Sequence, residues 1–216
     1  NEEIFDFEGQ KQNLIDNLEM LKEMSVEEQT LYKKWQEMNK GGKMSKVKKK
    51  LAGYQNNLWV PTDITNLETT IQEIESLEPY VEMATPGKGV TEWVNYRKLI
   101  HTMEWVANPG RNMKFWVRDR KTDKVLGLIC LGSDVTSIKV RDAYIGWDKT
   151  NKFDQHKLNN TAIATTICST QPGGYNMLMG KLVAALTTCK TIRDAWETKY
   201  GNKLIAVGTT SLYGIN

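Results

Sequence analysis

The chain has 216 residues, of which 40% are hydrophobic, 25% charged and 9% aromatic, and this composition is typical of a folded globular protein. It excludes a collagen-like or low-complexity chain, and no apolar run approaches the roughly 20 residues that a membrane-spanning helix needs. The net charge of +3 implies no partner by itself, and the acidic start Asn1-Glu2-Glu3 does not resemble a secretory signal, so we expect an intracellular protein without a membrane partner.

The N-terminal region is acidic and predicts a helical hairpin over residues 1–42. Leucines at helical spacing indicate a helix over residues 10–24, and Ser25 followed by Glu28 is a capping box that predicts a second helix from Val26 to about Asn39. Ten acidic and five basic side chains give this region a net charge of −5. We expect an arm that binds a protein partner, or alternatively a lid on the core.

A basic linker is expected over residues 43–60. Its lysine run, residues 43–50, carries five lysines and no acid, and it is a candidate nucleic-acid contact or simply a solvated surface. The candidate contacts are Lys46, Lys48, Lys49 and Lys50.

A helical connector is expected over residues 61–90, which have a net charge of −5. Thr65 and Glu68 form a second candidate capping box, and apolar side chains follow at helical spacing. Pro79 and Pro86-Gly87 are expected to end the helix.

Residues 91–216 have a net charge of +8 and predict an α+β (α/β) domain. An amphipathic helix over 91–107 precedes a β-hairpin formed by Met113–Asp119 and Val125–Leu131. Ala143–Trp147 and Thr161–Cys168 read as strands. Two helices, residues 178–188 and 191–199, are followed by a last strand over 203–208.

The loop after the Thr161–Cys168 strand is the first candidate site. Gly173-Gly174 lies between a strand and a helix, where free backbone N–H groups attract an anion, although the sequence is neither a Walker A nor a Rossmann motif. A simple turn that needs glycine is the alternative. The proposed ligand-binding residues are Gln171, Gly173, Gly174, Tyr175, Asn176 and Lys181.

Other candidate residues lie outside this loop. Arg141 and Asp142 form either a structural ion pair or an active-site pair, and Ser211 and Tyr213 offer hydroxyl groups that move a proton or merely cap a strand. Three cysteines and two histidines at wide spacing predict reduced thiols and no metal site, and no motif of a hydrolase is visible. Candidate nucleic-acid contacts in the domain are Trp116, Arg118, Arg120 and Trp147.

Several short motifs resemble the DruA family, which is named for the Druantia anti-phage system. The most specific is Arg141-Asp142-x-x-Ile145-Gly146-Trp147, and the others are Val125-Leu126-Gly127, Asn159-Asn160, Trp196 with Lys199-Tyr200-Gly201, and Thr209–Gly214. The resemblance covers roughly residues 90–216. It implies a protein of phage defence or of a mobile element, in a bacterial cell or encoded by a virus.

The order of elements is similar to the GNAT acyltransferase fold and to the phage Mom DNA-modification proteins. That similarity implies a mixed, mainly antiparallel sheet flanked by helices, and acetyl-CoA or a related acyl-CoA on the Gly173-Gly174 loop. Asn176 departs from the small residue expected there, and the elements expected after the last strand are not present in residues 91–216.

Two functions therefore follow as hypotheses. The first is a GNAT-like transferase that modifies DNA, with Arg141, Asp142, Ser211 and Tyr213 as candidate catalytic residues. The second is a binding or structural protein that keeps the fold, uses its basic face for nucleic acid and uses its acidic helices for a protein partner.

Overall fold

A computed structural model describes residues 7–40, 53–101, 105, 109–171, 173–177 and 179–210. The chain divides into two compact units, residues 1–50 and 51–216. Within the described residues, no helix is both long enough and apolar enough to cross a membrane.

The first unit contains the two predicted helices, α1 (Phe7–Glu23) and α2 (Val26–Lys40). The capping box is confirmed, because the Ser25 backbone N–H donates to the Glu28 carboxylate at 2.8 Å and the Glu28 N–H donates to Ser25 Oγ at 3.3 Å. The hydrogen bond from the Ser25 backbone lowers the pKa of Glu28. Local sequence is therefore sufficient to start α2.

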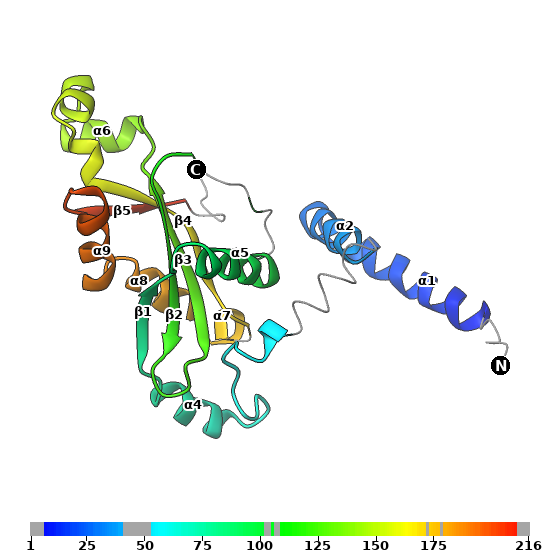
Figure 1. Cartoon of the computed structure of the whole chain (residues 1–216). Helices are drawn as coiled ribbons and strands as arrows, with labels where there is room; N and C mark the ends of the chain where they lie inside the picture. The colour runs from blue at the N-terminus through cyan, green and yellow to red at the C-terminus, as the bar shows by residue number, and fades with distance from the viewer. Residues whose placement is uncertain are drawn as a thin grey trace. The chain divides into compact units, whose positions relative to one another are not determined.

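The second unit is built on a sheet of five strands in the order β1-β2-β3-β4-β5 (Figure 1). The pairs β1–β2, β2–β3 and β3–β4 are antiparallel, whereas β4 and β5 are parallel. This confirms the predicted α+β class with a mainly antiparallel sheet. The strands are β1 (Pro79–Met83), β2 (Asn112–Asp119), β3 (Val125–Ser133), β4 (Thr161–Ser169) and β5 (Ala206–Thr209).

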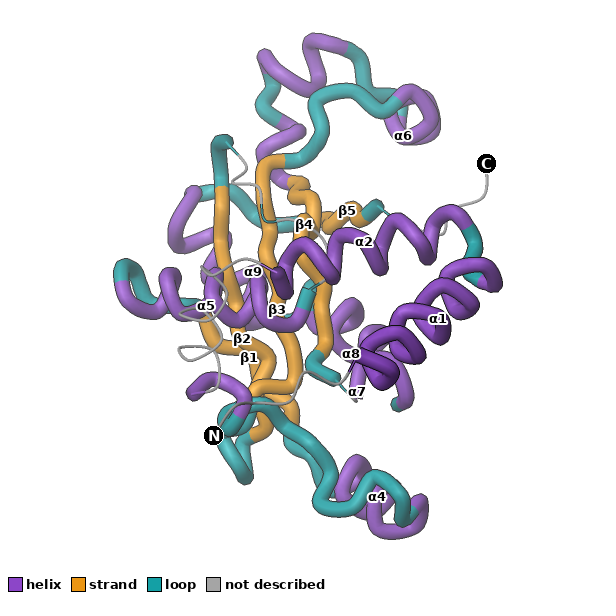
Figure 2. The backbone as a smooth tube through the Cα atoms, turned by 90° about the vertical axis from the view of Figure 1, so that its right-hand side faces the viewer, coloured by secondary structure: helices purple, strands orange, loops and turns teal. Residues whose placement is uncertain are grey.

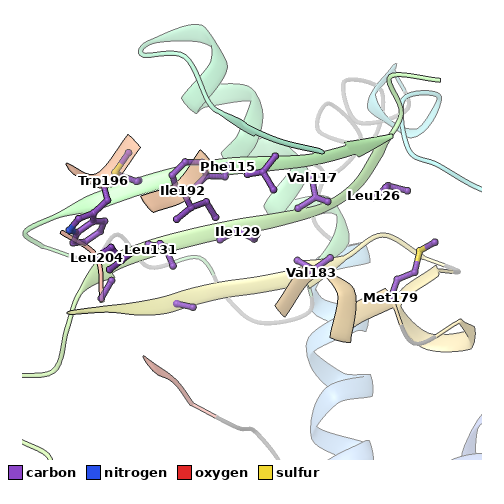
Figure 3. Close-up of a cluster of buried hydrophobic side chains, with 14 of the residues drawn as sticks. Phe115, Val117, Leu126, Ile129, Leu131, Met179, Val183, Ile192, Trp196 and Leu204 are labelled. Carbon is purple, nitrogen blue, oxygen red and sulfur yellow. The ribbon is translucent and has the colours of Figure 1, made fainter. Parts of the chain in front are cut away.

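Helices cover both faces of this sheet, whose strands Figure 2 shows side by side. α8 (Met179–Leu186) and α9 (Lys190–Tyr200) pack on one face, where Val183 and Trp196 join Phe115 and Ile129 in a buried cluster (Figure 3). α5 (Lys88–Ile100) packs on the other face through Trp93. Further helices of this unit are α4 (Leu67–Glu75), α6 (Lys139–Ile145), α7 (Gly173–Asn176) and two short turns of helix, η1 (Thr150–Asp154) and η2 (Lys157–Asn160).

The predicted hairpin is confirmed as β2 and β3, and its turn is fixed by a buried aspartate. The Asp119 carboxylate accepts the N–H and the hydroxyl of Thr122, and it also accepts the Glu78 N–H at 2.9 Å. Burial acts to raise the pKa of Asp119, but these hydrogen bonds outweigh it and the pKa is lowered.

Three predictions about elements were wrong. Ala143–Trp147 is not a strand, because α6 ends there and Gly146 adopts φ +69° as its C-terminal cap. The second capping box does not form, since Asn66 caps α4 and Thr65 bonds Asp63 instead. β1 was not predicted because Pro79 reads as a helix stop, yet it is the first residue of an edge strand, where a proline is tolerated.

Candidate functional site

The segment between β3 and β4, residues 134–160, is an insertion that stands beyond one end of the sheet (Figures 1 and 2). It carries α6, η1 and η2, and a network of ion pairs holds it together. Asp142 Oδ1 lies 2.8 Å from Arg141 Nη2, and Asp142 Oδ2 lies 2.6 Å from Lys152 Nζ. Arg141 also reaches Asp134 at 3.0 Å.

This network is buried and balanced in charge, with two cations and two carboxylates. The hydrogen bond from Lys152, followed by those from Arg141, lowers the pKa of Asp142. The ionised Asp142 carboxylate therefore stabilises the fold fully at neutral pH, and this stabilisation is lost as the pH falls through the lowered pKa. Asp142 thus joins α6 to η1 through Lys152, and Arg141 joins α6 to Asp134 at the start of the segment.

A cavity of about 230 Å³ lies between the insertion and the start of β2. Arg111 contributes to its wall, and the guanidinium is fixed by neutral acceptors: Nη1 donates to the Asn159 carbonyl at 2.8 Å and Nη2 donates to Asn202 Oδ1 at 3.0 Å. The lining residues are Arg111, Ser133, Asp134, Thr136, Lys152, Phe153, His156, Leu158, Asn159 and Thr161.

Two aromatic rings of α9 support the same guanidinium. Arg111 Cζ lies 5.0 Å from the centre of the Tyr200 ring and 5.7 Å from that of Trp196. Residues distant in the sequence therefore meet at this end of the sheet. Arg141, Asp142, Trp147 and Asn159 come from the insertion, whereas Trp196 and Tyr200 come from α9.

The outer surface of the insertion exposes two side chains of α6. Tyr144 is 90% exposed and Val140, one helical turn earlier in α6, is 81% exposed. Six cationic side chains at this end form no ion pair with any carboxylate that the structure describes, and three exposed carboxylates accompany them. The cations are Arg111, Lys139, Lys149, Lys157, Lys199 and Lys203, and the carboxylates are those of Asp148, Asp154 and Glu197.

The glycine loop lies at the opposite end of β4. Eight residue steps separate Thr161, next to the insertion, from Ser169, next to Gly173, which is about 26 Å along an extended strand. The structure therefore does not bring Arg141 and Asp142 together with the predicted cofactor loop.

The geometry of the loop accounts for both glycines by packing. A Cβ on Gly173 would lie 2.4 Å from Met179 Sδ, and one on Gly174 would lie 2.3 Å from Ser169 Oγ. The Gly174 N–H donates to the Thr170 carbonyl at 2.7 Å, so this amide is engaged within the protein. Gln171 and Lys181 are exposed beside the loop.

The predicted nucleic-acid contacts on β2 and just after it, Trp116, Arg118 and Arg120, differ in burial and in their partners. Trp116 is 4% exposed and packs edge-on against Tyr96, so it is not accessible for stacking on a base. Arg118 is paired with Glu82 at 3.4 Å. Arg120 remains accessible and stacks on Tyr80, with 4.9 Å from Cζ to the ring centre.

Some predicted residues lie outside the described part of the chain. These are Lys46, Lys48, Lys49, Lys50, Ser211 and Tyr213, and the side chains of Tyr175 and Asn176 are likewise outside it. Arg111, Asp134 and Lys152 were not predicted from the sequence. Arg111 joins the site through contacts 48 and 91 residues away, and Asp134 and Lys152 join it through ion pairs 7 and 10 residues away. The sequence Pro109-Gly110 indicates a turn directly before Arg111, and Gly110 does adopt φ +85°, which favours glycine.

The fold and this site together define an α+β protein with a cationic cavity at an inserted end of its sheet. The family model for the Druantia protein DruA matches residues 26–214, so the chain belongs to the DruA family. A Druantia protein DruA from Escherichia coli (strain UMEA 4076-1) is 28% identical over 153 residues. That match covers 65% of this chain and 37% of the relative, and no solved structure matches the chain.

Proposed function

We propose that this chain serves in Druantia anti-phage defence by binding nucleic acid, and that the insertion, residues 134–160, provides the binding surface. Family membership supports the defence role. The observation that carries the binding role is the exposed ring of Tyr144, which shares the insertion with Lys139, Lys149 and Lys157. Proteins that bind single strands combine such rings with cations along the backbone path.

The ion-pair network makes this surface suitable for binding. A stacking ring contributes most when its backbone is already ordered, because less conformational entropy is lost on binding. The carbonyl of Asp142 accepts the N–H groups of Gly146 and Trp147, and its carboxylate is held by Lys152. Tyr144 therefore stands on a short helix that is fixed at its C-terminal end.

Replacing Tyr144 by alanine tests this surface. We expect the affinity of the full chain for a single-stranded oligonucleotide to fall about tenfold, since stacking on an aromatic ring contributes about 1–3 kcal/mol per base. Fluorescence anisotropy of a labelled oligonucleotide measures the change.

Val140→Ala is the matched control, because Val140 lies on the same helix, is nearly as exposed and has no ring. Its affinity should equal that of the wild type. Equal losses in the two variants would argue against stacking and for an apolar protein-docking surface. No binding by the wild-type chain would refute the proposed function itself.

A second candidate is a GNAT-like transferase that modifies DNA with an acyl-CoA cofactor on the Gly173-Gly174 loop. The observation that favours it is the irregular pairing of β4. Its register with β3 shifts between Cys130 and Leu131, opposite Thr165, and it pairs with β5 only from Thr161 to Ala164. Such irregularities often occur next to active sites. Calorimetry with acetyl-CoA tests the cofactor, and nucleoside mass spectrometry of exposed DNA tests the reaction; no binding and no altered nucleoside would exclude it.

A further inference from the structure

The guanidinium of Arg111 is a cation in the wall of a cavity without a carboxylate partner. No described carboxylate pairs with it, and its hydrogen bonds to described residues use only Nη1 and Nη2, each to a neutral oxygen. The guanidinium has five N–H groups, so three donate to no acceptor among the residues that the structure describes. A half-buried cation with free donors is suited to an anion.

The backbone that carries Arg111 is held in place independently of its side chain. The Arg111 N–H donates to Ser133 Oγ at 2.9 Å, and the Ser133 N–H donates back to the Arg111 carbonyl at 3.1 Å. The next residue, Asn112, donates its N–H to Tyr200 Oη at 2.9 Å. The guanidinium is therefore preorganised, which lowers the cost of ordering it when a ligand binds.

The charge of the surroundings also favours an anion. Lys199 Nζ lies 5.2 Å from the centre of the same Tyr200 ring, and it is likewise without a carboxylate partner among the described residues. In the cavity wall, Asp134 and Lys152 are neutralised by their own ion pairs. Arg111 and Lys199 thus give the cavity wall and the neighbouring Tyr200 ring a net positive charge.

We infer that the cavity beside Arg111 binds a phosphate group, with Arg111 as its principal ligand. This inference rests on the proposed function, because the phosphate would belong to the backbone of a nucleic acid bound on the insertion. A free nucleotide would offer the same chemistry. Planar guanidinium groups with several donors match the geometry of phosphate oxygens, and a volume of about 230 Å³ accommodates the group.

Two variants separate ligand binding from a structural role of Arg111. Arg111→Gln removes the charge, and we expect about tenfold weaker binding of a single-stranded oligonucleotide, with a smaller salt dependence. Asn202→Asp keeps Arg111 and places a carboxylate where Asn202 Oδ1 now lies, 3.0 Å from Nη2. We expect this variant to be at least as stable as the wild type and yet to bind about tenfold more weakly, because the new carboxylate neutralises Arg111.

Arg193→Gln is the matched control, since Arg193 is an exposed arginine of α9 that does not line the cavity. It should bind like the wild type. A second arm of the experiment uses AMP and inorganic phosphate as competitors at constant ionic strength. Competition by AMP that far exceeds that by phosphate would identify a free nucleotide as the source.

The outcomes distinguish failure of the phosphate site from failure of nucleic-acid binding by the insertion. If the wild-type chain binds the oligonucleotide and both Arg111→Gln and Asn202→Asp bind equally well, the phosphate site is refuted while the proposed function stands. If the wild type binds no oligonucleotide but phosphate stabilises it to heat and does not stabilise Asn202→Asp, the site stands and the proposed function fails. Loss of stability in Arg111→Gln with unchanged affinity in Asn202→Asp would assign Arg111 a structural role only.

Discussion

Simultaneous replacement of Lys139, Lys149 and Lys157 by glutamate should weaken binding of single-stranded DNA about a hundredfold at low salt. Each lysine is exposed on the insertion and forms no ion pair with a described carboxylate, so reversing its charge removes a phosphate contact and adds repulsion. The slope of log affinity against log salt concentration should also fall by about three. Anisotropy titrations at several salt concentrations measure both quantities.

The control reverses three exposed lysines elsewhere in the second unit, namely Lys88, Lys98 and Lys121. The two triple variants have the same net charge, so any difference between them reports the position of the binding surface and not the overall field of the protein. Equal losses would show that binding is diffuse. A larger loss in the control would move the binding surface away from the insertion.

The second large effect concerns stability. Gly127→Ala should destabilise the second unit by about 3 kcal/mol, because overpacking a core that cannot relax is costly. A Cβ at this position would lie 2.6 Å from Val183 Cγ2 and 2.8 Å from the Cys168 carbonyl oxygen. The carbonyl belongs to the neighbouring strand β4 and cannot move without disturbing the sheet. Urea unfolding followed by tryptophan fluorescence measures the change.

Gly132→Ala is the control on the same strand. Its added Cβ would meet its nearest neighbours at 3.5 Å, which is ordinary van der Waals contact. We expect its free energy of unfolding to stay within about 1 kcal/mol of the wild type. If the two variants were equally stable, the close packing of α8 on β3 would not be a determinant of the fold.

Elements with a strong local pattern could be predicted from the sequence. The capping box of Ser25 and Glu28, the β2–β3 hairpin and the helices α8 and α9 all follow from contacts or periodicity within a few residues. β1 and α6 could not be predicted in this way. Pro79 is acceptable only because β1 lies at the edge of the sheet. The run before Trp147 belongs to α6, whose Asp142 is held by Lys152, ten residues along the chain.

The candidate site was predictable only in part, for the same physical reason. Arg141, Asp142 and Trp147 stood out as a motif, and the structure places them in one cluster. Arg111 did not stand out, because its importance depends on Asn159, Asn202 and Tyr200, which are 48 to 91 residues away in the sequence. Solvent exposure is equally nonlocal: Trp116 was predicted to contact nucleic acid and is buried, whereas Tyr144 is exposed.

Photochemical cross-linking locates the residues of this chain that contact a bound nucleic acid. The full chain would be irradiated with a single-stranded oligonucleotide that contains 5-iodouracil, and the cross-linked peptides would be identified by mass spectrometry. We predict that the cross-links lie within residues 134–160 and include Tyr144. Cross-links confined to the lysine run, residues 43–50, or to the surface around Arg120 would contradict the account, as would the absence of any cross-link at a saturating oligonucleotide concentration.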